Sequence, residues 1–339
     1  MIASSSILLT GGTGFIGSHI AIELARAGLR PVLFDNLCNS KASVTDRLAT
    51  IVGRPVDFVQ GDIRDGELMR RTLREHGVKA VIHLAGLKAV GESVQQPLAY
   101  WDNNVVGTLR MLEAMNDCDV RSLVFSSSAT VYGEPRQLPI TESHPLSASS
   151  PYGQTKLAIE RMLRDLAASD ERWHRCLLRY FNPVGAHESG LIGEDPNGVP
   201  NNLMPFVLKV GTGHFKQLGV LGADYPTPDG TGVRDYIHVV DLAIGHVRAL
   251  ERLDSMRCEA INLGTGRGTS VLELVEAFER VNGVHIPRET KPRRTGDVAA
   301  CFADATLAAT RLGWKTERTI DDMCRDAWRW QRSGGAATR

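Results

Sequence analysis

Tyr152 and Lys156 lie four residues apart in the segment SPYGQTK, residues 150–156. Helical spacing places residues i and i+4 on one face, so a phenol and an ammonium group can point into the same cleft. Because a nearby cation favours phenolate over phenol, we expect the pKa of Tyr152 to fall towards neutral pH. The pair predicts an acid–base catalyst for a carbon that carries a hydroxyl, next to a hydride acceptor.

A glycine-rich turn, GGTGFIG at residues 11–17, supplies the site for that acceptor. Gly11, Gly14 and Gly17 allow a tight turn, close approach to a pyrophosphate and close helix packing, and the following helix N-terminus faces the phosphates. Asp35 ends the next strand, where a carboxylate accepts hydrogen bonds from the adenosine ribose and repels a 2′-phosphate. This indicates NAD rather than NADP, although Asp35 can also be read as a cap of the next element.

Three consecutive serines, Ser126 to Ser128, end another strand-like run. Ligands of parallel sheets bind at the carboxyl ends of the strands, where a hydroxyl can hydrogen-bond a sugar oxygen and pass its proton to Tyr152. The triplet does not show which serine acts, and a turn also favours small polar residues. Either Ser149 or Ser150 caps the helix that carries Tyr152.

Strand-like and helix-like segments alternate through the first half of the chain, which predicts an α/β fold with a doubly wound parallel (Rossmann) sheet. We expect strands at 7–9, 31–34, 56–59, 80–84, 122–125 and 175–179, and helices at 18–27, 67–76, 100–115 and 152–166.

The composition changes after residue 181, where 185–232 is rich in Gly, Pro and Asn and holds one clear helix at 203–210. Long irregular stretches in compact proteins are usually functional, so this region predicts a smaller mixed α/β substrate-binding lobe. A helix at 239–253 and a strand at 260–263 suggest that the chain then returns to the first domain. We therefore assign residues 1–182 and about 235–265 to an NAD-binding domain, and residues 183–234 and 266–339 to the substrate-binding domain.

The bulk composition excludes several classes of protein. The 339 residues carry 39 Lys plus Arg against 39 Asp plus Glu, which does not favour nucleic acid or a membrane as a partner. The six cysteines are scattered without a CxxC pair, so we expect free thiols in the cytoplasm and no zinc site. No signal peptide, membrane span or metal-ligand spacing is expected. His83 and His238 lie in apolar runs and are read as hydrogen-bonded core residues.

Longer stretches then carry a family resemblance that covers residues 11 to about 330. The chain resembles the UDP-glucose 4-epimerases (UDP-galactose 4-epimerases), which are extended short-chain dehydrogenase/reductases. The resemblance rests on the segments DNLCNSK (35–41), HLAGLKAVGESVQ (83–95), FSSSATVYG (125–133), LRYFNPVGAH (178–187) and GTGVRDYIHV (230–239). It implies C4 epimerisation of UDP-glucose and UDP-galactose with tightly bound NAD, through a 4-ketohexose that turns over in the pocket.

The resemblance also implies a role for each matching position. Tyr152 removes the 4-hydroxyl proton, Lys156 binds the nicotinamide ribose and Ser128 lies beside the reacting hydroxyl. NAD contacts are implied for Gly11, Gly14, Phe15, Ile16, Gly17, Asp35, Asn36, Asn39, Ser40, Asp62, Ile63, Leu84, Ala85, Gly86, Lys88, Asn103, Ser126, Tyr152, Lys156 and Tyr180. UDP-sugar contacts are implied for Ser128, Tyr152, Asn182, Asn202, Leu203, Arg234, Arg294, Asp297 and Cys301, with Arg293 as an alternative to Arg294.

Cys301 aligns with a gate residue beside the hexose 2-substituent, which is a bulky Tyr in relatives restricted to plain hexoses. The smaller residue predicts that UDP-GlcNAc and UDP-GalNAc are also interconverted, unless neighbouring walls close the pocket. The family also implies a homodimer formed through the helices at 100–115 and 152–166.

Two other readings remain open at this stage. One is a different UDP-sugar enzyme, such as a pentose or uronate epimerase or a 4,6-dehydratase. A dehydratase needs an extra acid, yet Ser127-Ser128-Ala129 occupies the place of the expected Thr-Asp-Glu type cluster. The other is a nucleotide-binding sensor without catalysis, against which the presence of both Tyr152 and Lys156 argues.

Overall fold

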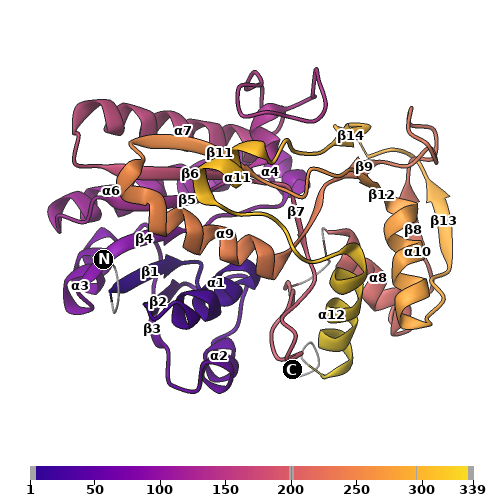
Figure 1. Ribbon diagram of the computed structural model, residues 1–339, viewed down its shortest axis with the longest axis horizontal. Coiled ribbons are helices and arrows are strands. Elements are labelled where there is room, and N and C mark those ends of the chain that lie inside the picture. The colour runs from indigo at the N-terminus through magenta and orange to yellow at the C-terminus, as the bar shows by residue number, and fades with distance from the viewer. Residues whose placement is uncertain (1–4, 198–199, 201, 295, 335–339) are drawn as a thin grey trace.

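A seven-stranded sheet forms the larger lobe of the computed structural model, which describes residues 5–197, 200, 202–294 and 296–334 (Figure 1). Its strand order is β11-β6-β5-β4-β1-β2-β3, and every neighbouring pair is parallel. The strands are β1 (Ser6–Thr10), β2 (Arg30–Asp35), β3 (Asp57–Gln60), β4 (Val78–His83), β5 (Ser122–Ser128), β6 (His174–Tyr180) and β11 (Cys258–Leu263). The predicted doubly wound parallel sheet is therefore confirmed.

Helices cover both faces of this sheet, which explains why its strands are apolar without alternation. In β1, Ile7 and Leu9 pack into one buried cluster and Leu8 packs into the other. The first cluster includes residues of α1 (Phe15–Arg26), α2 (Val44–Val52), α9 (Val239–Arg252) and α11 (Thr306–Leu312). The second includes residues of α3 (Gly66–Glu75), α6 (Gly107–Asp117) and α7 (Pro151–Ser169).

The helix expected at 100–115 is interrupted by a π-helical turn. It consists of α5 (Pro97–Tyr100), a π-helix at Trp101–Val106 and α6. Asn104 lies in this turn, where its side chain accepts from the Leu87 backbone N–H at 2.8 Å and donates to the Leu87 carbonyl at 3.0 Å. Such local widening is common at functional sites, and here it directs an amide into the loop after β4.

The smaller lobe, on the right of Figure 1, has its own buried core. In this lobe α8 (Leu203–Gly211), α10 (Val271–Asn282) and α12 (Ile320–Arg332) accompany the parallel pair β8 (Leu218–Leu221) and β13 (Arg288–Lys291). A second small sheet joins β12 (Thr269–Ser270), β9 (Val233–Arg234) and β14 (Ala300–Cys301). Between these elements, β7 (Asn182–Val184) pairs with β10 (Tyr236–His238), and β11 then adds to the large sheet beside β6.

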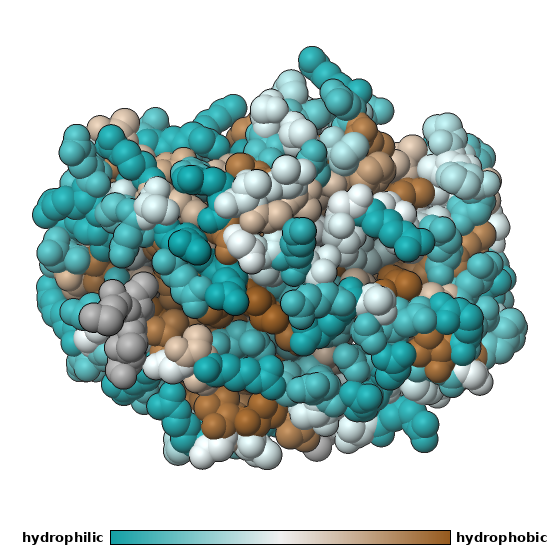
Figure 2. Space-filling view, in the orientation of Figure 1, coloured by the Kyte–Doolittle hydropathy of each residue, from teal (hydrophilic) through white to brown (hydrophobic). Residues whose placement is uncertain are grey.

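The surface in the view of Figure 2 is mostly hydrophilic, with small separate apolar areas. No helix among the described residues is long and apolar enough to cross a membrane. Nor do three or more His, Cys, Asp or Glu side chains gather there in a way that suits a metal ion.

Candidate active site

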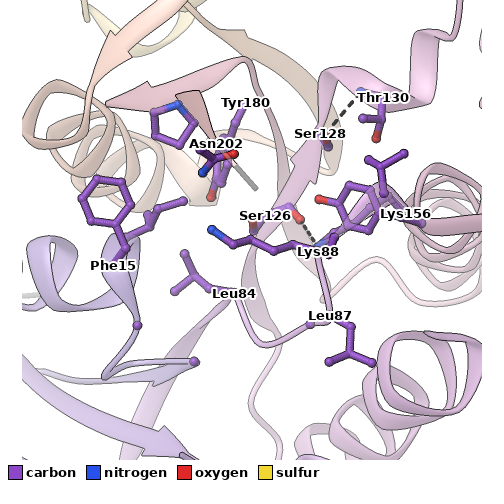
Figure 3. Close-up of a pocket in the computed structure, with 18 of the residues that line it drawn as sticks. Phe15, Leu84, Leu87, Lys88, Ser126, Ser128, Thr130, Lys156, Tyr180 and Asn202 are labelled. Atoms are coloured by element: carbon purple, nitrogen blue, oxygen red, sulfur yellow. Dashed lines mark hydrogen bonds between the residues drawn. The ribbon is translucent and has the colours of Figure 1, made fainter. Parts of the chain in front are cut away.

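A cavity of about 470 Å³ lies at the carboxyl ends of the large sheet and extends to residues of the smaller lobe (Figure 3). Most of the predicted site residues line it. They are Gly11, Gly14, Phe15, Ile16, Gly17, Asp35, Asn36, Asn39, Ser40, Ile63, Leu84, Ala85, Gly86, Lys88, Asn103, Ser126, Ser128, Tyr152, Lys156, Tyr180, Asn182, Asn202, Arg234, Arg294, Asp297 and Cys301.

Two predicted residues are not among those that line the cavity. The Asp62 carboxylate accepts hydrogen bonds from the side chains of Arg64 and Asn36, at 2.7 and 3.0 Å. These bonds keep the pKa of Asp62 well below its usual range. Leu203 is the first residue of α8 and packs on the core of the smaller lobe.

Backbone segments approach one another closely at the glycine turn, both within the turn and between the turn and the residues that follow β4. Gly11 has a φ of 70°, which favours glycine, and a Cβ there would lie 2.9 Å from the backbone nitrogen of Ala85. A Cβ at Gly17 would lie 2.3 Å from the Gly11 carbonyl oxygen. Gly14 caps α1 without a side-chain acceptor, so the first N–H groups of this helix are presented to the cavity for an anion.

Asp35 is held in place at the end of β2 by its own loop. One carboxylate oxygen accepts from the Thr13 backbone N–H, and the other accepts from the Leu37 N–H and the Ser40 hydroxyl. The alternative reading of Asp35 as a helix cap is wrong, because the N-cap of α2 is Ser43.

Tyr152 and Lys156 lie on one face of α7, which begins at Pro151 behind its N-cap Ser150. The Ser150 hydroxyl accepts from the Gly153 N–H at 3.1 Å, which settles the choice between Ser149 and Ser150. Lys156 donates to the backbone carbonyl of Ser126 at 2.7 Å, and its Nζ lies 6.0 Å from the centre of the Tyr152 ring.

The expected lowering of the Tyr152 pKa by Lys156 is not found. Burial raises the pKa of Tyr152 to about 12, opposed only by the interaction with the Ser128 side chain. Burial also lowers the pKa of Lys156 to about 8, although the Glu160 carboxylate acts in the opposite direction. The prediction failed because it counted the charge of Lys156 and left out the cost of burying phenolate.

The three serines of β5 have different partners, which the sequence did not reveal. Ser127 donates to the buried carboxylate of Glu160, on α7, at 2.6 Å. Ser126 accepts from Lys156 through its backbone carbonyl, and the Ser128 hydroxyl accepts from the Thr130 N–H at 3.2 Å and interacts with the phenol of Tyr152, whose pKa it lowers. Ser128 is therefore the serine whose hydroxyl lies beside the phenol.

Basic side chains gather at the end of the cavity in the smaller lobe. Arg294 donates to Asp297 at 2.7 Å, and Arg234 lies 3.5 Å from the same carboxylate oxygen. Arg293 instead pairs with Asp224 and stacks over Tyr225, away from the cavity. The geometry favours Arg294 over Arg293 as the second arginine of a diphosphate clamp.

Lys88 reaches from the loop after β4 toward Asn202 at the N-terminus of α8 (Figure 3). Both side chains bond the carboxylate of Glu194, Lys88 at 3.3 Å and Asn202 at 2.7 Å. Glu194 was missed by the sequence analysis, as were other lining residues: Phe34, Cys38, Leu87, Phe181, Asp195, Pro196 and Val298. Phe181 could have been predicted, because it lies within the motif LRYFNPVGAH. No pattern in the sequence indicated Glu194.

The fold and site together define a dinucleotide-binding protein of the dehydrogenase/reductase type, with a Tyr–Lys pair beside the carboxyl end of β5. Comparison with known proteins narrows this class. The family model described as GDP-mannose 4,6 dehydratase matches residues 8–327. The UDP-glucose 4-epimerase of Bacillus subtilis is 56% identical over 97% of both chains, and that of Drosophila melanogaster is 53% identical over 97% of both. The chain belongs to the UDP-glucose 4-epimerase family.

Solved structures agree with this placement. The chain superposes with a TM-score of 0.96 on the UDP-glucose 4-epimerase of Stenotrophomonas maltophila, which has bound NAD and formylated UDP-arabinopyranose. The two sequences are 52% identical, over 98% of this chain and 100% of that one. The UDP-glucose 4-epimerase of Bifidobacterium longum in complex with NAD+ and UDP superposes with a TM-score of 0.95. The two sequences are 52% identical, over 98% of this chain and 99% of that one.

Proposed function

We propose that this protein is an NAD-dependent UDP-glucose 4-epimerase that interconverts UDP-glucose and UDP-galactose. The observation that carries the proposal is one continuous cavity. It joins the glycine turn of α1 to Tyr152 and Ser128, and then to Arg234 and Arg294 in the smaller lobe. A dinucleotide and a UDP-sugar bound in this cavity would therefore both reach the phenol of Tyr152.

NAD supplies reversible acceptance of a hydride, and the residues present suit it. The N-terminus of α1, which has no side-chain cap, would hold the pyrophosphate, and Asp35 would hold the adenosine ribose. Lys156 is placed for the nicotinamide ribose. In this proposal residues 1–182 and about 235–265 hold NAD, while 183–234 and 266–339 hold the UDP-sugar.

Tyr152 takes the proton of the sugar 4-hydroxyl while C4 gives up its hydride, and Ser128 holds that hydroxyl in line with the phenol. A 4-ketohexose remains, attached to UDP. Arg234 and Arg294 bind the diphosphate, so the hexose can rotate while UDP stays in place, and it then presents its opposite face for return of the hydride. Tyr152 then returns the proton as the hydride returns to C4. The reaction leaves no net oxidation, which requires that NAD stay bound throughout.

The residues that follow β5 do not support 4,6-dehydratase chemistry. That reaction needs an acid to expel the 6-hydroxyl, and Ser128 is followed by Ala129 and Thr130. The described carboxylates that line the cavity come from other elements, and they are Asp35, Glu194, Asp195 and Asp297.

Purified protein without added cofactor, incubated with UDP-galactose, tests the proposal. Chromatography should resolve UDP-glucose as the product, because NAD copurifies with the protein. If UDP-galactose is unchanged even with NAD supplied, the proposed substrate is wrong, and UDP-pentoses and UDP-uronates are tested next.

The proposal extends to N-acetylated sugars through Cys301, which lies on β14 in the cavity wall and packs against the buried cluster that contains Phe181. Replacing Cys301 with Tyr adds a phenol ring to this wall. We expect Cys301→Tyr to abolish conversion of UDP-GalNAc and to keep most of the conversion of UDP-galactose. Cys301→Ser, which changes little volume, is the matched control and should convert both.

Both conversions are followed by chromatography of the products. Loss of both activities in Cys301→Tyr would contradict a gate. So would failure of the unaltered protein to convert UDP-GalNAc, since the other walls would then already close the pocket.

We also propose a homodimer formed through the helices predicted at 100–115 and 152–166, which correspond to α5, the π-helix and α6, and to α7. Apolar side chains are exposed in α4 (Val90–Gln95), α5, the π-helix and α6, and Leu98 is 83% exposed. The exposed members are Val90, Val94, Leu98, Trp101, Val106 and Leu109. Exposed apolar side chains that gather on consecutive elements support an association site there.

We expect Leu98→Glu to convert the dimer to a monomer in light scattering after size exclusion, because a carboxylate would be buried without a partner. Leu221→Glu alters an exposed leucine on β8 in the other lobe and should remain dimeric. An unaltered chain that is monomeric would contradict the proposed interface. A cytoplasmic location is proposed from the six cysteines, all of which are free thiols, and cell fractionation tests it.

A further inference from the structure

Tyr180 forms part of the cavity wall at the end of β6, and its side chain is only 6% exposed (Figure 3). Its hydroxyl bonds Nε2 of His246, a residue of α9. The two rings meet edge to face, with their centres 5.1 Å apart. A wall residue of the active site is thus tied to a helix behind the sheet.

The chemistry of His246 fixes the direction of this hydrogen bond. His246 is fully buried, and its Nδ1 lies 2.8 Å from the Leu242 carbonyl oxygen, one turn earlier in α9. A carbonyl only accepts, so Nδ1 carries the proton and Nε2 is the acceptor. Burial lowers the pKa of His246 to about 4, so the ring is neutral at neutral pH. Tyr180 therefore donates to His246.

The phenolic oxygen of Tyr180 has a second partner on β5. It interacts with the side chain of Ser126, which opposes the rise in the Tyr180 pKa that burial causes, and the backbone carbonyl of Ser126 accepts from Lys156 at 2.7 Å. His246, Tyr180, Ser126 and Lys156 thus form one connected series that runs from α9 through β6 and β5 to α7. α9 also packs against α1, the helix that faces the pyrophosphate site.

We propose that His246 is a positioning residue of the reaction: it holds Tyr180 and the end of β5, so that the part of the cavity wall against which the nicotinamide of NAD would rest stays fixed beside Tyr152. This rests on the proposed function and names a residue for it that does not line the cavity. Without the acceptor, the Tyr180 hydroxyl has to find another partner, and the ring and Ser126 shift with it. Small shifts of a hydride donor or acceptor cost much of the rate.

His246→Leu removes the acceptor, and His246→Gln keeps one on a side chain that reaches about as far. We expect His246→Leu to lower kcat for UDP-galactose on the order of tenfold with KM nearly unchanged, since the UDP clamp lies in the other lobe. His246→Gln should recover most of kcat. Tyr180→Phe should resemble His246→Leu, and the double variant should lose no more than either single variant.

A second readout does not depend on sugar turnover. Borohydride reduces the bound cofactor of the purified protein in place, and the fluorescence of the resulting NADH reports its surroundings. We expect an altered emission spectrum in His246→Leu and Tyr180→Phe, and a spectrum like that of the unaltered protein in His246→Gln.

The proposal is overturned if folded His246→Leu keeps its kcat and its NADH spectrum. It is also overturned if His246→Gln is as defective as His246→Leu, or if kcat and KM change in step with a loss of thermal stability. If the unaltered protein fails to turn over UDP-galactose, the proposed function falls, and the NADH spectra still decide whether His246 positions the cofactor.

Discussion

Tyr152→Phe is expected to lower kcat by about 10²- to 10⁴-fold, the range of a lost general acid–base, with its fold and bound NAD retained. The change removes one oxygen, which interacts with the Ser128 side chain. Ser128→Ala should have a smaller effect, because it removes a group that orients the sugar hydroxyl and leaves the base in place. Steady-state kinetics with UDP-galactose, together with cofactor content, measures both variants.

Tyr225→Phe is the matched control, since Tyr225 is buried beneath Arg293 away from the cavity. It should keep nearly all of the activity. If Tyr152→Phe retains a substantial share of kcat, another group removes the proton. Of the residues nearby, Lys156 is the one to test next, because its pKa of about 8 lies close to neutral pH.

A phenol with a pKa near 12 is protonated at neutral pH, so the folded chain does not by itself create a strong base. When NAD+ is bound, its nicotinamide would supply a positive charge that favours phenolate, by the same electrostatics that the sequence analysis ascribed to Lys156 alone. Formation of the base would then be coupled to the oxidised state of the cofactor.

The parts of this site that were predictable depend on local pattern. The helix spacing of Tyr152 and Lys156, the glycine turn and the strand ends that carry Asp35 and Ser128 can be read along the chain. Their convergence follows from the rule that parallel strands present their carboxyl ends on one edge. Most of the predicted residues therefore line one cavity.

What could not be predicted depends on contacts between distant segments. Whether Ser127 faces α7 is decided by Glu160, 33 residues later, and the π-helical turn is accompanied by the bonds of Asn104 with the loop after β4. Glu194 gains its place only when the smaller lobe folds against Lys88. The pKa of Tyr152 was misjudged for the same reason, since burial is a property of the packed structure.

The second large effect is expected on stability, at the buried pair of Glu160 on α7 and Arg179 on β6. Both side chains are almost fully inaccessible, and Arg179 donates to the two carboxylate oxygens at 2.9 and 2.7 Å. Arg179 also donates to the Tyr132 hydroxyl at 2.9 Å, and Ser127 donates to Glu160. This network fixes α7 against the strands that end at the active site.

We expect Glu160→Ala to lower the free energy of unfolding by about 3–5 kcal/mol, because it leaves the guanidinium of Arg179 buried without a counter-charge. Denaturant unfolding measures the loss. Replacing both partners, as in Glu160→Met with Arg179→Met, should cost much less than Glu160→Ala, since no buried charge is left unpaired. A double variant as unstable as Glu160→Ala would show that packing, and not the unpaired charge, sets the cost.

The Glu160–Arg179 pair also allows an effect on stability to be distinguished from an effect on catalysis. Glu160 follows Tyr152 and Lys156 at four-residue steps on α7, and its negative charge opposes the loss of the proton from Lys156. In the double Met variant this charge is absent, so the pKa of Lys156 should fall further below its ordinary value. The alkaline limb of the kcat profile should then move to lower pH even where the fold is as stable as that of the unaltered protein. An unchanged profile would limit Glu160 to its role in holding α7 in place.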